Sequence, residues 1–187
     1  MSAVGEHDEG AERAERTERR WASVSVVVIA TLVVVAAFAG IYHETMPQFH
    51  VETVNPRTLH LTGEFIESNL GSALEPDGSV TVRAIGQQYS FTPQCIVVPA
   101  ATQINVRATS ADVVHGFLID GTNVNTMLVP GYVSTTTMRF DSPGEHHMPC
   151  HEYCSVGHEG MWGKIVVIDR QDYLQRAATR RRLDCVK

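Results

Sequence analysis

The longest uncharged apolar stretch of the chain covers residues 21–42. At ~1.5 Å per residue, a helix of this length is roughly 33 Å long, which is enough to cross a hydrocarbon core of about 30 Å. Many of its residues are β-branched, which disfavours a helix in water but not in lipid, where the backbone must satisfy its own hydrogen bonds. Trp21 and Tyr42 stand at the two ends, where amphipathic rings prefer the membrane interface. The pattern therefore predicts one transmembrane helix over 21–42.

The residues before this stretch indicate its orientation. Residues 1–20 are polar, with alternating Glu and Arg and no apolar stripe, so we expect a disordered or frayed helical tail. Arg19 and Arg20 abut the start of the span, whereas His43 and Glu44 follow its end. Because basic residues stay on the cytoplasmic side, the tail is predicted to be cytoplasmic. The rest of the chain then lies on the extracytoplasmic side of the plasma membrane.

A cleaved signal peptide is the alternative to a retained anchor. Residues 37–39, Ala-Phe-Ala, resemble an Ala-x-Ala cleavage site, which would leave Gly40 as the mature N-terminus. The apolar region of a signal peptide is about 7 to 15 residues long, however, and this stretch is longer. The length favours the retained anchor.

After the span, the hydrophobic pattern changes twice. Residues 43–78 contain several Pro and Gly and show little periodicity, which predicts an extended connector. From Ser79 onward, short apolar-polar alternations recur about every 8 to 12 residues with Pro and Gly turns between them, which is typical of an all-β sandwich. We expect this sandwich over 79–168. Residues 169–187 are predicted to form a short basic helix in a solvated tail, with attraction to anionic lipid as the alternative.

The distribution of charge bears on the partners. The formal net charge is −6, and residues 43–168 alone hold twelve acids and five bases, a net of −7. An acidic body argues against a nucleic-acid partner and favours a cationic protein.

The chemistry of the chain is concentrated in residues 150–161. This stretch carries the thiols of Cys150 and Cys154, the imidazole of His158 and the thioether of Met161. Thiolate and thioether are soft ligands that favour copper, whereas structural zinc sites take four Cys or His ligands and no thioether. A disulfide between the two cysteines is the alternative in an oxidising compartment.

A second stretch, residues 110–117, supplies His115 at the end of a β-like run. One remote His followed by Cys, His and Met on a late loop is how a cupredoxin-type β-sandwich assembles a copper site. A single-copper site of that kind needs one Cys. Because this chain has two, the pattern favours a two-copper centre bridged by both thiolates. Cys95 and Cys185 lie outside the motif, and the sequence leaves open whether they pair.

The chain resembles subunit II of the haem-copper terminal oxidases, the polypeptide that carries the dinuclear CuA centre. The resemblance is to the single-span form that accompanies b-type cytochrome c oxidases, and it covers roughly residues 20 to 168. The motifs that carry it lie at 110–117, 121–125, 130–135 and 150–161. It implies a cupredoxin-like Greek-key β-sandwich behind one N-terminal transmembrane helix.

The resemblance also implies a set of copper ligands. Cys150 and Cys154 would bridge two coppers, and each copper would take one imidazole, from His115 or His158. Met161 would be the weak axial ligand beside His115, and the backbone carbonyl of Glu152 would take that part beside His158. In many relatives the side chain of this acid helps to bind Mg²⁺ at the boundary with subunit I.

Some of the residues around the ligands have two interpretations. Asp112 is expected to fix the strand of His115. Tyr89 and Phe91 either pack in the core or form an aromatic patch where the electron donor docks. Trp162 is either a lid over the site or a contact with the partner subunit. The remaining histidines nearby are interpreted as surface or near-surface residues: His146, His147 and His151.

The implied function is electron entry into a membrane cytochrome c oxidase. Electrons from cytochrome c or a small copper protein would reach haem in subunit I, where oxygen is reduced to water with proton translocation. The chain has no nucleophile or acid/base pair for bond-making, so the catalytic centre is expected in the partner. The alternatives are the CuA subunit of a nitric oxide reductase, a membrane-tethered copper electron carrier and a copper-delivery protein.

Overall fold

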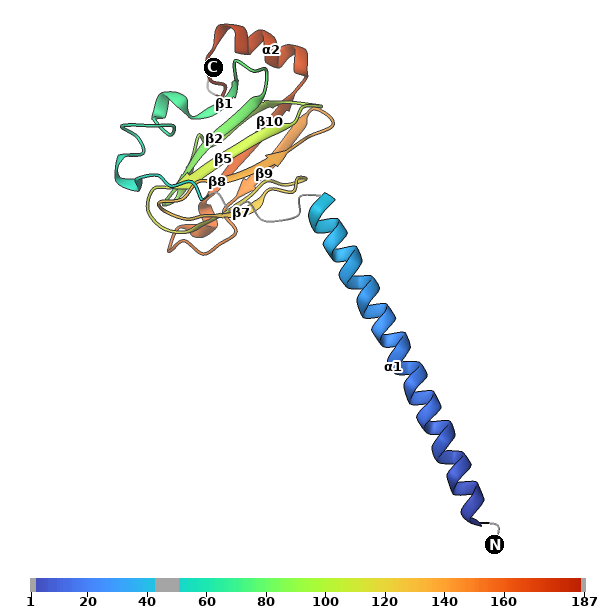
Figure 1. The fold of residues 1–187 in the computed structure, drawn as a ribbon. Helices are drawn as coiled ribbons and strands as arrows, with labels where there is room; N and C mark the ends of the chain where they lie inside the picture. The colour runs from blue at the N-terminus through green and yellow to red at the C-terminus, as the bar shows by residue number, and fades with distance from the viewer. Residues whose placement is uncertain (1–2, 43–50, 186–187) are drawn as a thin grey trace. The chain divides into compact units, whose positions relative to one another are not determined.

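A computed structural model describes residues 3–42 and 51–185 of the chain. The beginning of the predicted connector, with His43 and Glu44, therefore lies outside the described residues. The chain divides into two compact units, Met1–Phe49 and His50–Lys187, which are described separately below (Figure 1).

The described residues of the first unit form one long helix, α1 (Ala3–Tyr42). It includes the polar residues before Trp21, for which a disordered or frayed helical tail was predicted. Ion pairs one helical turn apart stabilise this polar part: Arg16 lies 3.6 Å from Glu12, and Arg19 lies 2.6 Å from Glu15. The segment Glu12–Ile41 is long and apolar enough to cross a membrane, and its apolar side chains are exposed, as lipid contact requires.

The second unit is an all-β sandwich, which confirms the predicted fold class (Figure 1). One sheet has the order β1-β2-β5-β8, with β3 paired to β2. Its strands are β1 (Gly71–Leu74), β2 (Val80–Gln87), β3 (Ser90–Thr92), β5 (Ile104–Ser110) and β8 (Ser134–Met138). A second sheet has the order β4-β10-β9, formed by β4 (Cys95–Pro99), β10 (Trp162–Ile168) and β9 (Gly144–Pro149). A separate two-stranded sheet is formed by β6 (His115–Leu118) and β7 (Asn125–Leu128).

The strands bury one face in a shared core. Along β10 the exposed and buried residues alternate, so that Ile165 and Val167 face inward. The aromatic centre of the core is an edge-to-face pair in which the rings of Phe91 and Phe117 lie 5.2 Å apart. Two parallel pairings, β2 with β5 and β4 with β10, join strands that are distant in sequence.

The predicted connector is more ordered than its sequence pattern suggests. It contains two short 3₁₀ helices, η1 (Pro56–Thr58) and η2 (Glu67–Asn69), and the edge strand β1, so the sandwich begins at Gly71. β1 has only four residues, which is too short for a clear alternation. Glu64 fixes the connector to the sheet, because its carboxylate accepts hydrogen bonds from Arg83 at 2.9 Å and Arg107 at 2.6 Å.

The ion pairs with Arg83 and Arg107 lower the pKa of the Glu64 carboxyl. Burial alone would raise the pKa of its carboxyl, but the hydrogen bonds and charges of Arg107 and Arg83 outweigh it and hold the pKa below its ordinary value. Arg107 also contacts Glu52 at 2.5 Å, nearer the start of the connector. The arginines of β2 and β5 therefore hold two points of the connector.

The C-terminal segment packs on the sandwich instead of forming the solvated tail that was expected. The helix itself, α2 (Arg170–Thr179), is confirmed. Tyr173 is fully buried, and its hydroxyl lies 3.1 Å from that of Ser72 in β1. Leu183 is buried as well, and Cys185 forms a disulfide with Cys95 of β4. The buried side chains of Tyr173 and Leu183, together with the disulfide, thus hold this basic segment on the sandwich.

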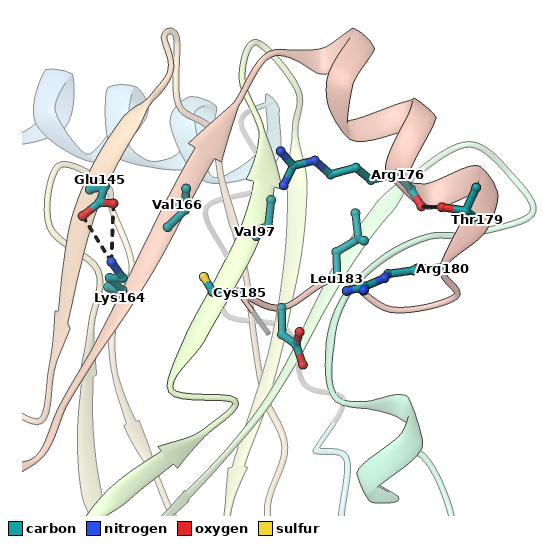
Figure 2. Close-up of a pocket in the computed structure, with 10 residues that line it drawn as sticks. Val97, Glu145, Lys164, Val166, Arg176, Thr179, Arg180, Leu183 and Cys185 are labelled. Atoms are coloured by element: carbon teal, nitrogen blue, oxygen red, sulfur yellow. Dashed lines mark hydrogen bonds and ion pairs between the residues drawn. The ribbon is translucent and has the colours of Figure 1, made fainter. Parts of the chain in front are cut away.

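A cavity of about 540 Å³ lies between α2 and the β4-β10-β9 sheet (Figure 2). Its lining mixes charges of both signs, and Lys164 of β10 pairs with Glu145 of the neighbouring strand β9 at 3.3 Å. None of the residues from the Cys150–Met161 loop lines this cavity. The soft donor atoms lie elsewhere in the sandwich.

Candidate metal centre

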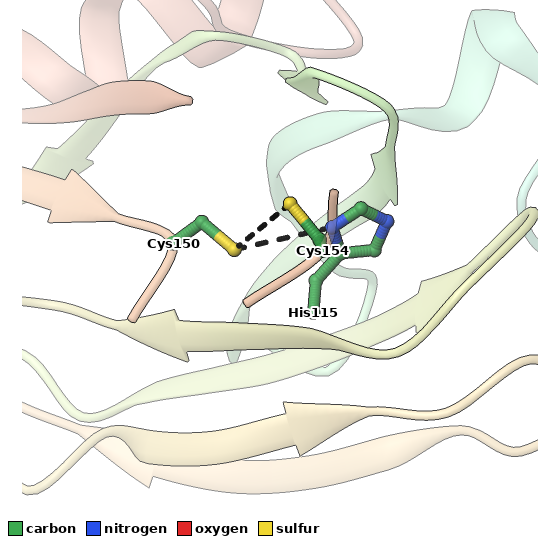
Figure 3. A group of neighbouring side chains, drawn as sticks. All are labelled: His115, Cys150 and Cys154. Carbon is green, nitrogen blue, oxygen red and sulfur yellow. Dashed lines mark hydrogen bonds between the residues drawn. The ribbon is translucent and has the colours of Figure 1, made fainter. Parts of the chain in front are cut away.

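Three buried side chains from distant parts of the sequence meet at one point of the sandwich (Figure 3). His115 stands at the start of β6, Cys150 directly follows β9, and Cys154 lies in the loop after it. Their nitrogen and sulfur donor atoms all lie within 4.8 Å of one another. The topology therefore places the remote histidine beside the thiols, as the sequence predicted.

The loop from Cys150 to Met161 is closed by a hydrogen bond of 3.0 Å between the main-chain N–H of the first and the carbonyl of the last. A short 3₁₀ helix, η3 (His158–Gly160), turns the chain back toward the thiols. As a result, Nδ1 of His158 lies 3.6 Å and Sδ of Met161 lies 3.7 Å from the sulfur of Cys154. The carbonyl oxygen of Glu152 lies 3.2 Å from the sulfur of Cys150.

The spacing of these atoms fits a metal centre. Donors that share one metal ion at about 2.0–2.3 Å lie roughly 3.3–3.8 Å apart at tetrahedral angles. The two sulfurs are 3.8 Å apart, and Nδ1 of His115 is 3.9 Å from the sulfur of Cys150. Both cysteines are free thiols, in contrast to the disulfide that the sequence left as an alternative. Two thiols, two imidazoles and a thioether form a soft donor set that suits copper.

The protonation of the thiols depends on their surroundings. Burial, and next the neighbouring Cys150, raise the pKa of the Cys154 thiol to about 11. The metal-free protein therefore keeps this thiol protonated at neutral pH. Because a bound metal needs the thiolate, metal binding here releases protons.

Asp112, which is expected to fix the strand of His115, contacts the imidazole of that residue. Its Oδ1 lies 2.8 Å from Nε2 of the imidazole, which leaves Nδ1 on the side of the thiols. Desolvation opposes the charge on Asp112, but hydrogen bonds from the main-chain N–H of Gln88, from His115 and from the N–H of Val113 outweigh it and lower the pKa of this carboxyl. The carboxylate thus stays charged beside the ring.

Two glycines allow the ligand loop to lie close to its surroundings. A Cβ at Gly116 of β6 would lie 2.5 Å from the main-chain nitrogen of Glu152. A Cβ at Gly157 would lie 2.6 Å from the ring of Tyr89. Both distances are shorter than any normal contact, so larger residues would push the loop away.

Gln88 is a residue near the candidate ligands that the sequence did not single out. Its main-chain N–H donates to Oδ2 of Asp112 at 2.7 Å, and its side-chain Nε2 donates to the carbonyl of Cys154, also at 2.7 Å. A glutamine just after a strand belongs to no recognisable motif. Only the structure shows that Gln88 contacts both Asp112 and Cys154, which are far from it in the sequence.

The structure separates the residues that were considered for donor docking. Phe91 is 1% exposed and packs against Phe117, so of its two predicted alternatives the core position holds and the exposed patch does not. Tyr89 lies in the turn after β2 and is 39% exposed, because this turn interrupts the alternation that would have placed both rings on one face. Trp162 is 50% exposed, and its Nε1 donates to the carbonyl of Glu159 at 2.9 Å.

The remaining histidines near the loop lie outside the donor group. His147 and His151 are exposed, as predicted. His146 is half-buried, with Nδ1 3.0 Å from the carbonyl oxygen of Asp120. The side chain of Glu152 points to the surface, where it is exposed.

Comparisons with known proteins give a consistent result. The family model described as "Cytochrome C oxidase subunit II, periplasmic domain" matches residues 87–169. A cytochrome c oxidase subunit 2 from Thermus thermophilus is 32% identical over 152 residues, which cover 80% of this chain and 90% of the relative. A second such subunit from the same organism is 35% identical over 122 residues, covering 65% and 90%. Among solved structures, a chain of a heme-copper terminal oxidase dimer matches with a TM-score of 0.56 and 25% identity, over 81% of this chain and 99% of that one.

Proposed function

The chain belongs to the cytochrome c oxidase subunit II family, whose members are parts of an oxidoreductase complex, and on this premise we propose that it is the electron-entry subunit of a membrane terminal oxidase. The observation that carries the proposal is the buried group of soft donors around Cys150 and Cys154. Such a set suits copper and one-electron transfer, and offers no group for bond-making.

We assign six residues to a centre of two copper ions. Cys150 and Cys154 would hold both ions through their thiolates, and the thioether of Met161 and the carbonyl of Glu152 would supply further, weaker donors. His115 and His158 each supply one Nδ1, and both nitrogens lie within 4 Å of a thiol sulfur. Copper bound there would supply reversible one-electron transfer. The rigid sandwich would hold the donors in nearly the same positions in both redox states.

The electron then passes to a partner that holds haem, where oxygen is reduced to water with proton translocation. The donor is cytochrome c or a small copper protein, and the acidic body of this chain supports a cationic one. Exposed Tyr89 and Trp162 beside the ligand loop are candidates for its docking surface. The exposed carboxylate of Glu152 is a candidate ligand for Mg²⁺ at the boundary with the haem-bearing subunit.

The family and the apolar helix support attachment to a membrane. We propose the plasma membrane, with residues 1–20 cytoplasmic and 21–42 spanning it. The CuA domain then lies on the extracytoplasmic side, with its sandwich beginning at Gly71 and the C-terminal segment packed against it. A reporter fused after Lys187 is expected to be active only outside the cytoplasm.

The function is tested by purifying the tagged full-length chain from membranes of its source. We expect a haem-bearing, many-span partner to co-purify, and a reduced c-type cytochrome to reduce the copper centre before the haem in rapid-mixing absorbance measurements. A complex that reduces nitric oxide but not oxygen would identify a nitric oxide reductase instead. Isolation without any haem protein would identify a tethered electron carrier.

A further inference from the structure

Gln88 connects the two halves of the donor set through hydrogen bonds. On one side, its carboxamide Nε2 donates to the main-chain carbonyl of Cys154 at 2.7 Å. On the other, its main-chain N–H donates at 2.7 Å to Oδ2 of Asp112, whose Oδ1 holds Nε2 of His115. Two candidate metal ligands, Cys154 of the late loop and His115 of β6, are thus joined by one continuous chain of hydrogen bonds.

The hydrogen bond from Gln88 meets the ligand loop, residues 150–161, where its backbone is strained. Ser155, directly after Cys154, has a φ of 109°, a backbone conformation that residues other than glycine rarely adopt. A strained residue persists only where its surroundings hold it in place. The hydrogen bond from Gln88 acts on the peptide group between Cys154 and Ser155. The next residue of the same turn, Tyr89, lies with its ring against Gly157, so the turn contacts the loop at two points.

We infer that Gln88 is a positioning residue for the metal centre, which fixes Cys154 relative to His115 and favours the reduced state. The inference rests on the proposed function and assigns it a residue beyond the ligands. Partners that orient ligands typically change metal affinity about 10- to 100-fold when they are removed. The amide also directs the positive end of its N–H dipole at the main chain of a thiolate ligand, which stabilises the state that has gained an electron.

The test compares three variants of the full-length chain in detergent, loaded with copper. Gln88→Leu removes the amide donor while the main-chain N–H to Asp112 remains. Gln88→Glu keeps the size but replaces the donor by a carboxylate. Gln94→Leu is the matched control, because Gln94 is also an exposed glutamine whose Nε2 donates to a main-chain carbonyl, that of Trp162, at 3.0 Å. Competition with a Cu(I) chelator, the reduction potential and the thermal unfolding of the copper-free chain are measured for each.

We expect both leucine variants to lower the unfolding temperature of the copper-free chain by similar amounts. Only Gln88→Leu should also bind copper about tenfold more weakly and shift the potential to lower values. Gln88→Glu should shift the potential further in the same direction, because a negative charge disfavours the added electron. If Gln88→Leu does not fold, Gln88→Asn, whose amide is one methylene short of the carbonyl, takes its place.

The inference is overturned if Gln88→Leu and Gln88→Glu match Gln94→Leu in copper affinity and potential. The proposed function is judged separately, by the copper content of the unsubstituted chain. The change in copper affinity between a variant and the unsubstituted chain reports on Gln88 whether one or two copper ions are bound.

Discussion

The carboxylate of Asp112 lies 2.8 Å from Nε2 of His115, while the other ring nitrogen, Nδ1, lies 3.9 Å from the sulfur of Cys150. The imidazole is therefore held between a charged acceptor and the thiols. This contact determines which nitrogen is available to a metal ion. It also increases the basicity of the ring toward that ion.

Removal of the carboxylate should weaken the metal centre. Asp112→Ala is expected to lower copper affinity about 10- to 100-fold, and Asp112→Asn to lower it less, because the amide oxygen can still accept from Nε2 without the charge. The measurement is competition with a Cu(I) chelator. Asp141→Asn is the control, since Asp141 is highly exposed and pairs only with Arg139 among the ion pairs of the described residues. Unchanged affinity in Asp112→Ala would mean that the loop alone orients His115.

Close packing around the ligand loop predicts a sharp contrast between two neighbouring glycines. Gly157→Ala should destabilise the folded chain by about 1–3 kcal/mol, because the new methyl would overlap the ring of Tyr89. Gly160→Ala should be nearly neutral, because a Cβ there has no atom within 4 Å. Urea unfolding measures both. The pair Gly157→Ala with Tyr89→Ala should recover part of the loss, and equal effects of the two single glycine changes would contradict the packing account.

Acid should weaken the attachment of the connector through Glu64. Because the pKa of Glu64 is lowered in the folded chain, its contribution is fully present above the unfolded-state value of about 4.5 and is lost as pH falls through the lower folded value. Glu64→Gln should therefore destabilise the chain by roughly 1–3 kcal/mol at about pH 7 and by progressively less below about pH 4.5. Urea unfolding over a pH series measures this. Exposed Glu67 supplies the control Glu67→Gln, and a pH-independent difference for Glu64→Gln would exclude the ion pairs as its cause.

The disulfide should hold the C-terminal segment on the sandwich. Cys95 and Cys185 are 90 residues apart, so the bond closes a long loop, and its loss should cost about 2–5 kcal/mol. Cys185→Ser should therefore make the arginines at 180–182 more accessible to trypsin. Limited digestion followed by mass spectrometry measures the cleavage, with the unsubstituted chain under non-reducing conditions as the control. Identical digestion would mean that buried Tyr173 and Leu183 suffice.

The features that the sequence predicted are those encoded by local patterns. The long apolar helix follows from an unbroken apolar run, and the strands follow from alternation between turns. The donor residues follow from fixed offsets within residues 150–161, and the single remote His115 follows from its own motif. In each case the information lies in residues that are close together in the chain.

The features that the sequence did not predict depend on contacts between distant residues. The side chain and main chain of Gln88 contact residues 66 and 24 positions away, and Tyr173 is buried against Ser72, 101 positions away. Alternation places Phe91 and Tyr89 on one face only if the strand continues between them, and a turn interrupts it there. No local pattern distinguishes an exposed aromatic from a core one when the strand ends between them.

The copper content and the EPR spectrum of the full-length chain in detergent report on whether Cys150 and Cys154 together hold two copper ions. We expect two coppers per chain and a hyperfine pattern from one unpaired electron shared over both nuclei. Cys150→Ser and Cys154→Ser should each abolish that pattern, whereas Met161→Leu should keep it with a changed potential, since an axial thioether is a weak ligand. One copper per chain, or zinc bound in preference to copper, would contradict the account.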